Sequence, residues 1–334
     1  MAVINTNFPS LVDVTKRTNP DGSISAIAEL LAQTNPILED AVMVEGNGMT
    51  DHTVTIRTGL PTVYFRMFNQ GVPPSKSTTV QVKEAMAILE AYAEVDKDLA
   101  MLNGNTATFR LSEDRAFIEA MNQKQAETVF YGNPQQDPKA YAGLAIRYST
   151  KAGAINGRNI ILAGTADTAD NASVYLVVWS DSTVYMTYPK GSQGGLQVRD
   201  LGEDTTTDAA GGKYQVLRTH YQWKCGLVVK DWRYVVRIAN ISAAALAGGT
   251  PPDLVHLFSD AIDLIPSMSM GRAAFYAPRH VVGYLRRQAA TRTVNVLATE
   301  AALTQLGLRI VNTTFLGIPV RITDALLATE ADIA

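Results

Sequence analysis

Residues 50–82 constrain the fold of this chain more than any other segment, because their pattern predicts a long β-hairpin. Val54 and Ile56 alternate with polar side chains and predict a first strand. A Gly-Leu-Pro turn at residues 59–61 leads into a second β-like stretch at residues 63–68. The polar remainder of the segment ends in a further β-like run. A strand of about ten residues reaches roughly 33 Å, so a hairpin of this length with a largely polar far end is expected to project as an arm.

Two segments that follow the hairpin are predicted to be helices. Residues 84–104 consist mostly of helix-forming residues and end at an Asn-Gly-Asn break. Residues 112–131 form the clearest helical pattern. Ser112 is a good N-cap, acidic residues occupy the first turn, and Gly132 follows the last residue. At a rise of about 1.5 Å per residue, about 20 residues make a rod of roughly 30 Å.

The remainder of the chain mixes strands with helices and predicts an α+β fold. Residues 1–22 are polar and rich in turn signals, which predicts an extended arm, and residues 23–33 show the apolar spacing of a short helix. Residues 158–240 contain several runs of β-branched and aromatic residues and predict a mainly β region. The C-terminal part is expected to add helices after Pro252 and Pro278, and strands near residues 309–311 and 318–322.

Composition excludes several classes of protein. A chain of 334 residues with 46% hydrophobic residues can bury one large core or two modest ones. Its 29 basic and 32 acidic residues do not predict the basic surface of a sequence-specific DNA reader, although loose contact with DNA remains compatible. The lone cysteine, Cys225, excludes an intrachain disulfide and lies in an apolar run, so we expect it to be buried.

The sequence also gives no sign of a route into or across a membrane. No apolar run approaches the roughly 20 residues that a spanning helix needs. The first residues lack the basic and apolar regions of a signal peptide. We therefore expect no membrane partner and synthesis in a reducing cytosol.

Motifs that would carry chemistry are not found in the sequence. The histidines, none of which has the spacing of a zinc hydrolase motif, are His52, His220, His256 and His280. The Gly-Gly-Lys at residues 211–213 is only a partial match to a phosphate loop and is interpreted as a turn. We therefore predict no catalytic, cofactor-binding or metal-binding residue, no cofactor, and no enzymatic activity.

An acidic cluster and a basic cluster remain as candidate sites. The acidic cluster consists of Glu90, Glu94, Asp96 and Asp98. A metal site or an acid/base pair is conceivable there, but a solvated helix face paired with Lys97 is the favoured interpretation. The basic cluster consists of Arg279, Arg286, Arg287 and Arg292. It could touch phosphate, but such arginines more often pair with acids on a neighbouring surface.

The order of these elements and several local segments resemble tailed-bacteriophage major capsid proteins, most closely those of short-tailed phages, with the Hong-Kong-phage-type capsid fold. The similar segments are dense over about the first 150 residues and include Asp21-Gly-Ser-Ile-Ser-Ala-Ile-Ala-Glu-Leu-Leu, Arg57-Thr-Gly-Leu-Pro, Glu94-Val-Asp-Lys-Asp-Leu-Ala, Phe117-Ile-Glu-Ala-Met-Asn-Gln and Phe130-Tyr-Gly-Asn. The resemblance implies an N-terminal arm at residues 1–45 and an extended loop at residues 46–82. It also implies a peripheral domain with a long spine helix, residues 83–150 and 266–334, and a β-rich axial domain at residues 151–265.

The resemblance further implies a protein that assembles with itself into hexamers and pentamers of an icosahedral phage head enclosing double-stranded DNA. Expected partners are a scaffolding protein, a portal, a cement protein and, through non-specific contact, the packaged DNA. Assembly is expected in the host cytoplasm and the final location in the virion. The predicted inter-subunit contact residues are Arg57, Tyr64, Arg66, Lys76, Arg286 and Arg287. Some relatives crosslink their subunits through a Lys–Asn isopeptide bond. Lys76 is the only lysine on the hairpin arm and so the only candidate there, but an ordinary surface lysine is favoured.

One alternative from a different class stays open on the sequence alone. The chain could be a β-rich hydrolase or a carbohydrate-binding module with the acidic cluster at residues 90–98 as its site. Alanine replacement of Glu94 and Asp98 would test this alternative, because loss of a hydrolytic activity with particle assembly intact would favour it.

Overall fold

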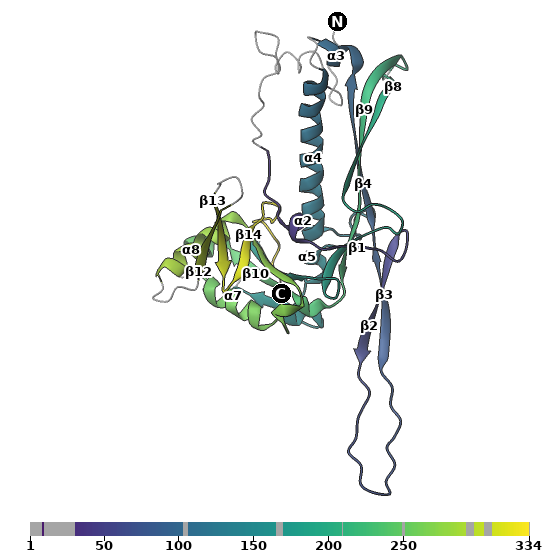
Figure 1. Ribbon diagram of the computed structural model, residues 1–334. Coiled ribbons are helices and arrows are strands. Elements are labelled where there is room, and N and C mark those ends of the chain that lie inside the picture. Colours follow the sequence, from purple (N-terminus) through teal and green to yellow (C-terminus); the bar gives the residue numbers. More distant parts are fainter. Residues whose placement is uncertain are drawn as a thin grey trace. The chain divides into compact units, whose positions relative to one another are not determined.

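The computed structural model describes residue 9 and residues 31–102, 106–164, 170–208, 210–248, 251–291, 297–303 and 309–333. The chain divides into two compact units (Figure 1). The first, here called the helix unit, comprises Met1–Thr34, Ile88–Ala126 and Gly195–Lys224. The second, the sheet unit, comprises Asn35–Ala87, Glu127–Gly194 and Cys225–Ala334.

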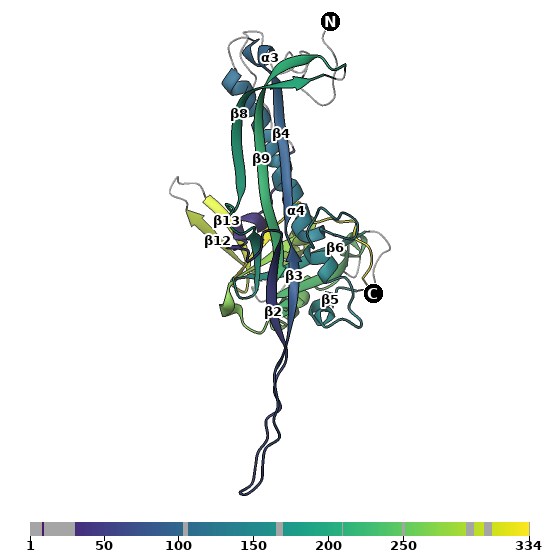
Figure 2. The same ribbon diagram turned by 90° about the vertical axis from the view of Figure 1, so that its right-hand side faces the viewer.

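The helix unit packs one long helix on an antiparallel sheet. Its elements are β4 (Ala87–Asp96), α3 (Lys97–Met101), α4 (Thr106–Tyr131), β8 (Leu196–Thr207) and β9 (Lys213–Val229). The register of β8 against β9 runs from Leu196↔Trp223 to Thr207↔Lys213, and β4 lies on the other side of β9 (Figure 2). Ala93, Met121 and Tyr221 form the core between helix and sheet, with Phe117 stacked on Tyr221 at a ring separation of 5.9 Å.

The prediction of a helix over residues 84–104 is wrong. This stretch forms the end of β3, then β4 and the short helix α3, which Asp96 caps by accepting hydrogen bonds from the backbone of Asp98 and Leu99. Alanine, leucine and glutamate favour helices when a segment is isolated, but tertiary packing overrides that preference. The period-two alternation of Ala91, Ala93 and Val95 with polar residues is the signal that predicts a strand here.

The prediction of a long helix before Gly132 is confirmed, but its start is wrong. Helix α4 has 26 residues and begins at Thr106, so it is roughly 39 Å long. Ser112 is therefore not an N-cap. It lies inside the helix, where its hydroxyl donates to the Phe109 carbonyl at 2.8 Å.

The sheet unit is built on a mixed sheet with the strand order β12-β13-β14-β11-β6-β7-β9. Off this path, β1 pairs with β7, and β10 pairs with β5 and β6. The strands not yet bounded are β1 (Met43–Glu45), β5 (Ile160–Leu162), β6 (Asn171–Trp179), β7 (Val184–Tyr188), β10 (Val235–Ser242), β11 (Arg272–Ala277), β12 (Leu297–Leu303), β13 (Arg309–Phe315) and β14 (Ile318–Ile322). Every residue of β6 and β10 is buried, as expected for central strands of a covered sheet.

Short and medium helices complete the sheet unit. They are α2 (Ile37–Asp40), α5 (Leu144–Arg147), α6 (Ala243–Ala247), α7 (Leu254–Asp263) and α8 (Arg279–Thr291), with 3-10 turns at Asn156–Asn159, Trp232–Tyr234 and Met268–Met270. The rings of Phe258 on α7, Phe275 on β11 and Phe315 on β13 pack together, with 4.6 Å between Phe258 and Phe275. The helices predicted after Pro252 and Pro278 are thereby confirmed.

Most of the predicted strands are confirmed, and Cys225 is buried as expected. β8 was not predicted, because its residues are largely polar and exposed. Strands β6 and β11, which come from segments expected in different domains, pair in one sheet. The expected domain boundaries remain a prediction. The predicted N-terminal arm and its short helix lie outside the described residues, apart from Pro9 and residues 31–45.

Candidate assembly surfaces

The hairpin predicted from the sequence is present in the sheet unit. Strands β2 (Asp51–Gly59) and β3 (Thr78–Ala85) pair antiparallel, from Asp51↔Ala85 to Gly59↔Thr78. The predicted second strand at residues 63–68 is wrong, because β2 pairs with the later run around Val80. Residues 60–77 instead form a long distal loop, and the arm projects away from the helices and sheet of its own unit (Figures 1 and 2).

The distal loop carries apolar side chains that nothing in the same chain covers among the described residues. The largest are Phe65 and Phe68, which are 108% and 96% exposed, and further exposed residues are Leu60, Val63, Tyr64, Met67 and Val72. The expectation of a largely polar end is therefore wrong for this part of the loop. Contiguous exposed apolar surface of this kind marks an interaction site.

The arm is also cationic. Arg57, Arg66 and Lys76 are exposed, and no aspartate or glutamate occurs between Thr53 and Val82. Among the described residues these cations form no ion pair. Arg66 instead donates to the Gln70 carbonyl at 3.4 Å, and Ser75 donates across the loop to the Thr62 carbonyl at 2.7 Å. The predicted contact residues Arg57, Tyr64, Arg66 and Lys76 are thus brought together on one arm, available to a partner.

The root of the arm is held by a buried ion pair and an apolar cluster. The Arg147 guanidinium donates to both carboxylate oxygens of Glu84, at 2.7 and 2.6 Å. Val54 packs with Tyr185 and Val228. A bidentate ion pair between mostly buried groups fixes the direction of β3 at the point where the arm leaves the rest of the sheet unit.

The remaining predicted contact residues, Arg286 and Arg287, lie on α8, away from the arm in the fold. Both side chains are exposed. Arg286 donates to the Thr313 hydroxyl at 2.6 Å, and Arg287 lies over the Tyr284 ring, 4.9 Å from its centre. Arg279 of the same cluster pairs within the chain with Asp324, and Arg292 lies outside the described residues.

The acidic cluster does not form a catalytic pair. Glu90 lies 3.9 Å from the His220 ring nitrogen, and Glu94 pairs with Arg218 at 2.7 Å, both on strands of the helix unit. The expected partner Lys97 pairs with Glu203 instead, at 2.8 Å. Glu94 is therefore used in an ion pair across strands, as cross-strand neighbours commonly are, and Asp96 is used as the N-cap of α3.

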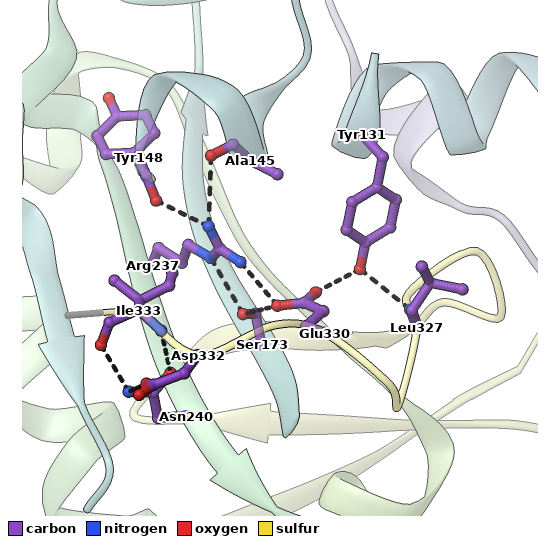
Figure 3. Close-up of polar contacts among 10 residues, drawn as sticks. All are labelled: Tyr131, Ala145, Tyr148, Ser173, Arg237, Asn240, Leu327, Glu330, Asp332 and Ile333. Atoms are coloured by element: carbon purple, nitrogen blue, oxygen red, sulfur yellow. Dashed lines mark hydrogen bonds and ion pairs between the residues drawn. The ribbon is translucent and has the colours of Figure 1, made fainter. Parts of the chain in front are cut away.

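The deepest polar network of the sheet unit is structural (Figure 3). Glu330 accepts hydrogen bonds from Tyr131, Ser173 and Arg237, and Arg237 also donates to the Tyr148 carbonyl at 2.7 Å. Burial, and then the charge of Glu330, raise the pKa of Tyr131 far above its usual range, so this hydroxyl stays protonated as a donor. The network fastens the segment around Glu330 to β6 and β10. Sequence reasoning missed it, because its members are far apart along the chain.

The described part of the chain has few features of a metal site, a membrane span or an enclosed active site. It contains no group of three or more His, Cys, Asp or Glu side chains placed to hold a metal. None of its helices is long and apolar enough to cross a membrane. A cavity of about 500 Å³ in the sheet unit is lined by Lys151, Gly157, Arg158, Ile160, Ile161, Asp260, Asp263 and Leu264. This lining contains no histidine, cysteine, serine or threonine.

Comparison with known proteins agrees with the arm-bearing fold. Residues 19–334 match the family model described as Major capsid protein GP7. A chain in the structure of bacteriophage Epsilon15 is 32% identical, with a TM-score of 0.77 over 100% of this chain and 99% of that one. The bacteriophage JBD30 capsid, at 11% identity and a TM-score of 0.50 over 90% and 95% of the two chains, shares the fold. No curated protein sequence matches significantly.

The family match covers nearly the whole chain, and the expectation of a phage capsid fold is confirmed. The hydrolase or carbohydrate-binding alternative is not favoured. The chain belongs to the GP7 family of major capsid proteins, and it is a self-assembling structural protein of a virion shell.

Proposed function

We propose that this protein builds the hexamers and pentamers of an icosahedral phage head around double-stranded DNA, with the arm of each subunit lying on an adjacent copy. Assembly would take place in the host cytoplasm, with a scaffolding protein, a portal and a cement protein as partners. DNA contact would be non-specific, and the protein would have no catalytic activity. The observation that supports this proposal best is the exposed apolar loop at the end of the arm.

The energetics of that loop favour a permanent partner. Burying a large apolar side chain contributes about 1.5–3 kcal/mol. Phe65 and Phe68 are almost fully exposed in the isolated chain, so each can contribute on this scale only when another surface covers it. Arg57, Arg66 and Lys76 lie on the same arm as these rings, so the complementary surface is expected to combine apolar and acidic groups.

The expected division of the chain supplies the rest of the proposal. Residues 46–82 would be the extended loop, and residues 151–265 would be the axial domain that meets its copies at capsomer centres. Residues 83–150 and 266–334 would form the peripheral domain. Arg286 and Arg287 would contact acids on a neighbouring subunit, because their described contacts leave both side chains exposed.

The decisive experiment replaces both rings of the loop. The Phe65→Ser, Phe68→Ser double variant is expected to fold like wild type, because both rings are almost fully exposed and none of the described residues covers them. It should nevertheless fail to form closed particles in electron micrographs. Ile155→Ser is the matched control, because Ile155 is 69% exposed but lies outside the arm. Normal particles from the double variant would refute the proposed contact.

A charge-reversal variant tests the expectation that the partner surface is acidic. Arg57→Glu, Arg66→Glu and Lys76→Glu together should slow or abolish assembly without changing the unfolding midpoint. Lys83→Glu is the control for a single charge reversal at the root of the arm. It removes a lysine at the arm root, whose contact with Asp51, at 3.8 Å, is a weak exposed pair. Equal assembly rates for the triple variant and wild type would contradict an acidic partner surface.

A further inference from the structure

A histidine stands at the root of the arm with both ring nitrogens engaged. The backbone N–H of Asn47 donates to His52 Nδ1 at 3.2 Å, and His52 Nε2 lies 2.8 Å from the Tyr185 hydroxyl. Because Nδ1 accepts a hydrogen bond, the ring is neutral, its proton is on Nε2, and Nε2 donates to the Tyr185 oxygen. One neutral tautomer therefore ties β2 both to the loop before it and to β7.

The loop before β2 is held by further contacts next to His52. Asn47 also forms two hydrogen bonds with the backbone of Thr53. Its side-chain N–H donates to the Thr53 carbonyl at 2.7 Å, and its side-chain oxygen accepts from the Thr53 N–H at 2.8 Å. The His52 ring meets the Tyr185 ring edge-on, with 5.7 Å between centres. Tyr185 in turn packs on Val54 of the arm. The first turn of the arm is thus held by the contacts of His52 and by those of its neighbours Asn47 and Tyr185.

A proton on Nδ1 is incompatible with the bond from the Asn47 N–H. Two N–H groups would then face each other, so the bond from Asn47 must break. We propose that His52 is a proton-operated latch at the root of the arm, whose neutral ring holds the arm in its described direction and whose protonation releases it. The consequence for the shell rests on the proposed contact of the arm with an adjacent copy, but the latch itself lies within one chain.

The charges around the His52 ring do not make its protonated form the favoured one. Burial, and then the charge of Lys230, lower the pKa of His52, while Glu84 and Asp51 act in the opposite direction. Glu84 is already paired with Arg147, and Asp51 lies 3.8 Å from Lys83. The Tyr185 hydroxyl stays protonated, since burial and then Glu84 and Asp181 raise its pKa. The groups that face His52 from β2, β3, β7 and the end of β9 therefore leave its neutral form favoured.

The direction of the pH effect follows from linkage. A histidine whose pKa is lowered in the latched state binds fewer protons there than in the released state. The latch is therefore complete above about pH 6.5, the ordinary value for histidine, and weakens as the pH falls through the lowered pKa. Acidification should loosen residues 46–58 before it unfolds the sheet unit.

Hydrogen–deuterium exchange of the full-length protein, measured before assembly, tests the latch. After correction for intrinsic exchange, residues 46–58 of wild type should exchange roughly threefold faster or more at about pH 5 than at about pH 8. His52→Gln should remove this pH response, while His256→Gln should keep it, because His256 is an exposed histidine on α7. A response that persists in His52→Gln, or none in wild type, would overturn the proposal.

A second variant keeps the test valid if His52→Gln folds poorly. Tyr185→Phe retains the ring packing but removes the acceptor of the His52 Nε2–H, so its arm root should exchange faster already near pH 8. Exchange equal to wild type would count against the latch. Because this readout needs no particles, the latch and the proposed arm contact can fail independently: the Phe65 and Phe68 variant tests the contact alone.

Discussion

Glu330 and Arg237 show how single residues hold the sheet unit together. They form an ion pair of 2.7 Å with both side chains only 6% exposed. Ser173 and Tyr131 complete the hydrogen bonds of the carboxylate, and the backbone N–H of Leu327 donates to the Tyr131 hydroxyl at 3.0 Å. A buried charge is tolerated only when paired in this way, so removing one member leaves the other without compensation.

Replacing Glu330 should therefore be strongly destabilising. Glu330→Gln removes the charge that neutralises Arg237 and should lower the free energy of unfolding by about 3 kcal/mol. The matched control is Asp324→Asn, which weakens the pair with the exposed Arg279 side chain and should cost about 1 kcal/mol or less. Denaturant unfolding of both variants measures the difference. Equal losses would mean that burial does not set the strength of the Glu330 pair.

At the scale of elements, local pattern and tertiary context disagree most over residues 84–112. β4 has a helix-forming composition but forms a strand, because its alternating small residues pack on α4. Helix α4 starts before Ser112, and the Ser112 hydroxyl donates a hydrogen bond to the Phe109 carbonyl one turn earlier. Capping signals identify a helix end only when no helical residues precede them, and here Thr106–Leu111 precede Ser112.

Two alanine substitutions separate these roles. Ser112→Ala should change the free energy of unfolding by less than about 0.5 kcal/mol, because an interior serine gives little to a helix. Asp96→Ala should cost about 1 kcal/mol, since it removes the cap of α3. Thermal or denaturant unfolding distinguishes them. A loss for Ser112→Ala as large as for Asp96→Ala would assign a capping role to Ser112.

For the whole molecule, the question is which residues serve folding and which serve assembly. The distal loop at residues 60–77 is exposed throughout, whereas the arm root is tied to the body by Val54 and by the pair of Glu84 with Arg147. A variant that keeps the residues of the arm root should therefore keep the fold, even if the loop is changed or deleted. This separation is expected for a subunit whose arm acts only between copies.

Deleting residues 61–76 and joining the strands with a short Asn-Gly turn tests that separation. An Asn-Gly turn suits a tight hairpin, so the variant should fold with an unfolding midpoint close to wild type. It should remain unassembled under conditions in which wild type forms particles, as measured by sedimentation. Loss of the folded state would show that the loop contributes to folding, and normal assembly would show that the arm is dispensable.

The sequence by itself determined the elements whose signals are local. The alternation of Val54 and Ile56, the long helical run before Gly132, and the helices after Pro252 and Pro278 all arise from neighbouring residues, so they could be predicted. Phe65 and Phe68 indicate an apolar tip of the arm in the sequence itself, but the polar residues after Val72 favoured the prediction of a polar end.

Only the tertiary structure decided which strands pair and which polar groups meet. β2 pairs with β3 rather than with residues 63–68, and β4 is a strand only because α4 covers it. Glu330 and Arg237 are 93 residues apart, and the tautomer of His52 depends on Asn47 and on the distant Tyr185. Pairing and desolvation act between segments that are far apart in the chain, and no local pattern records them.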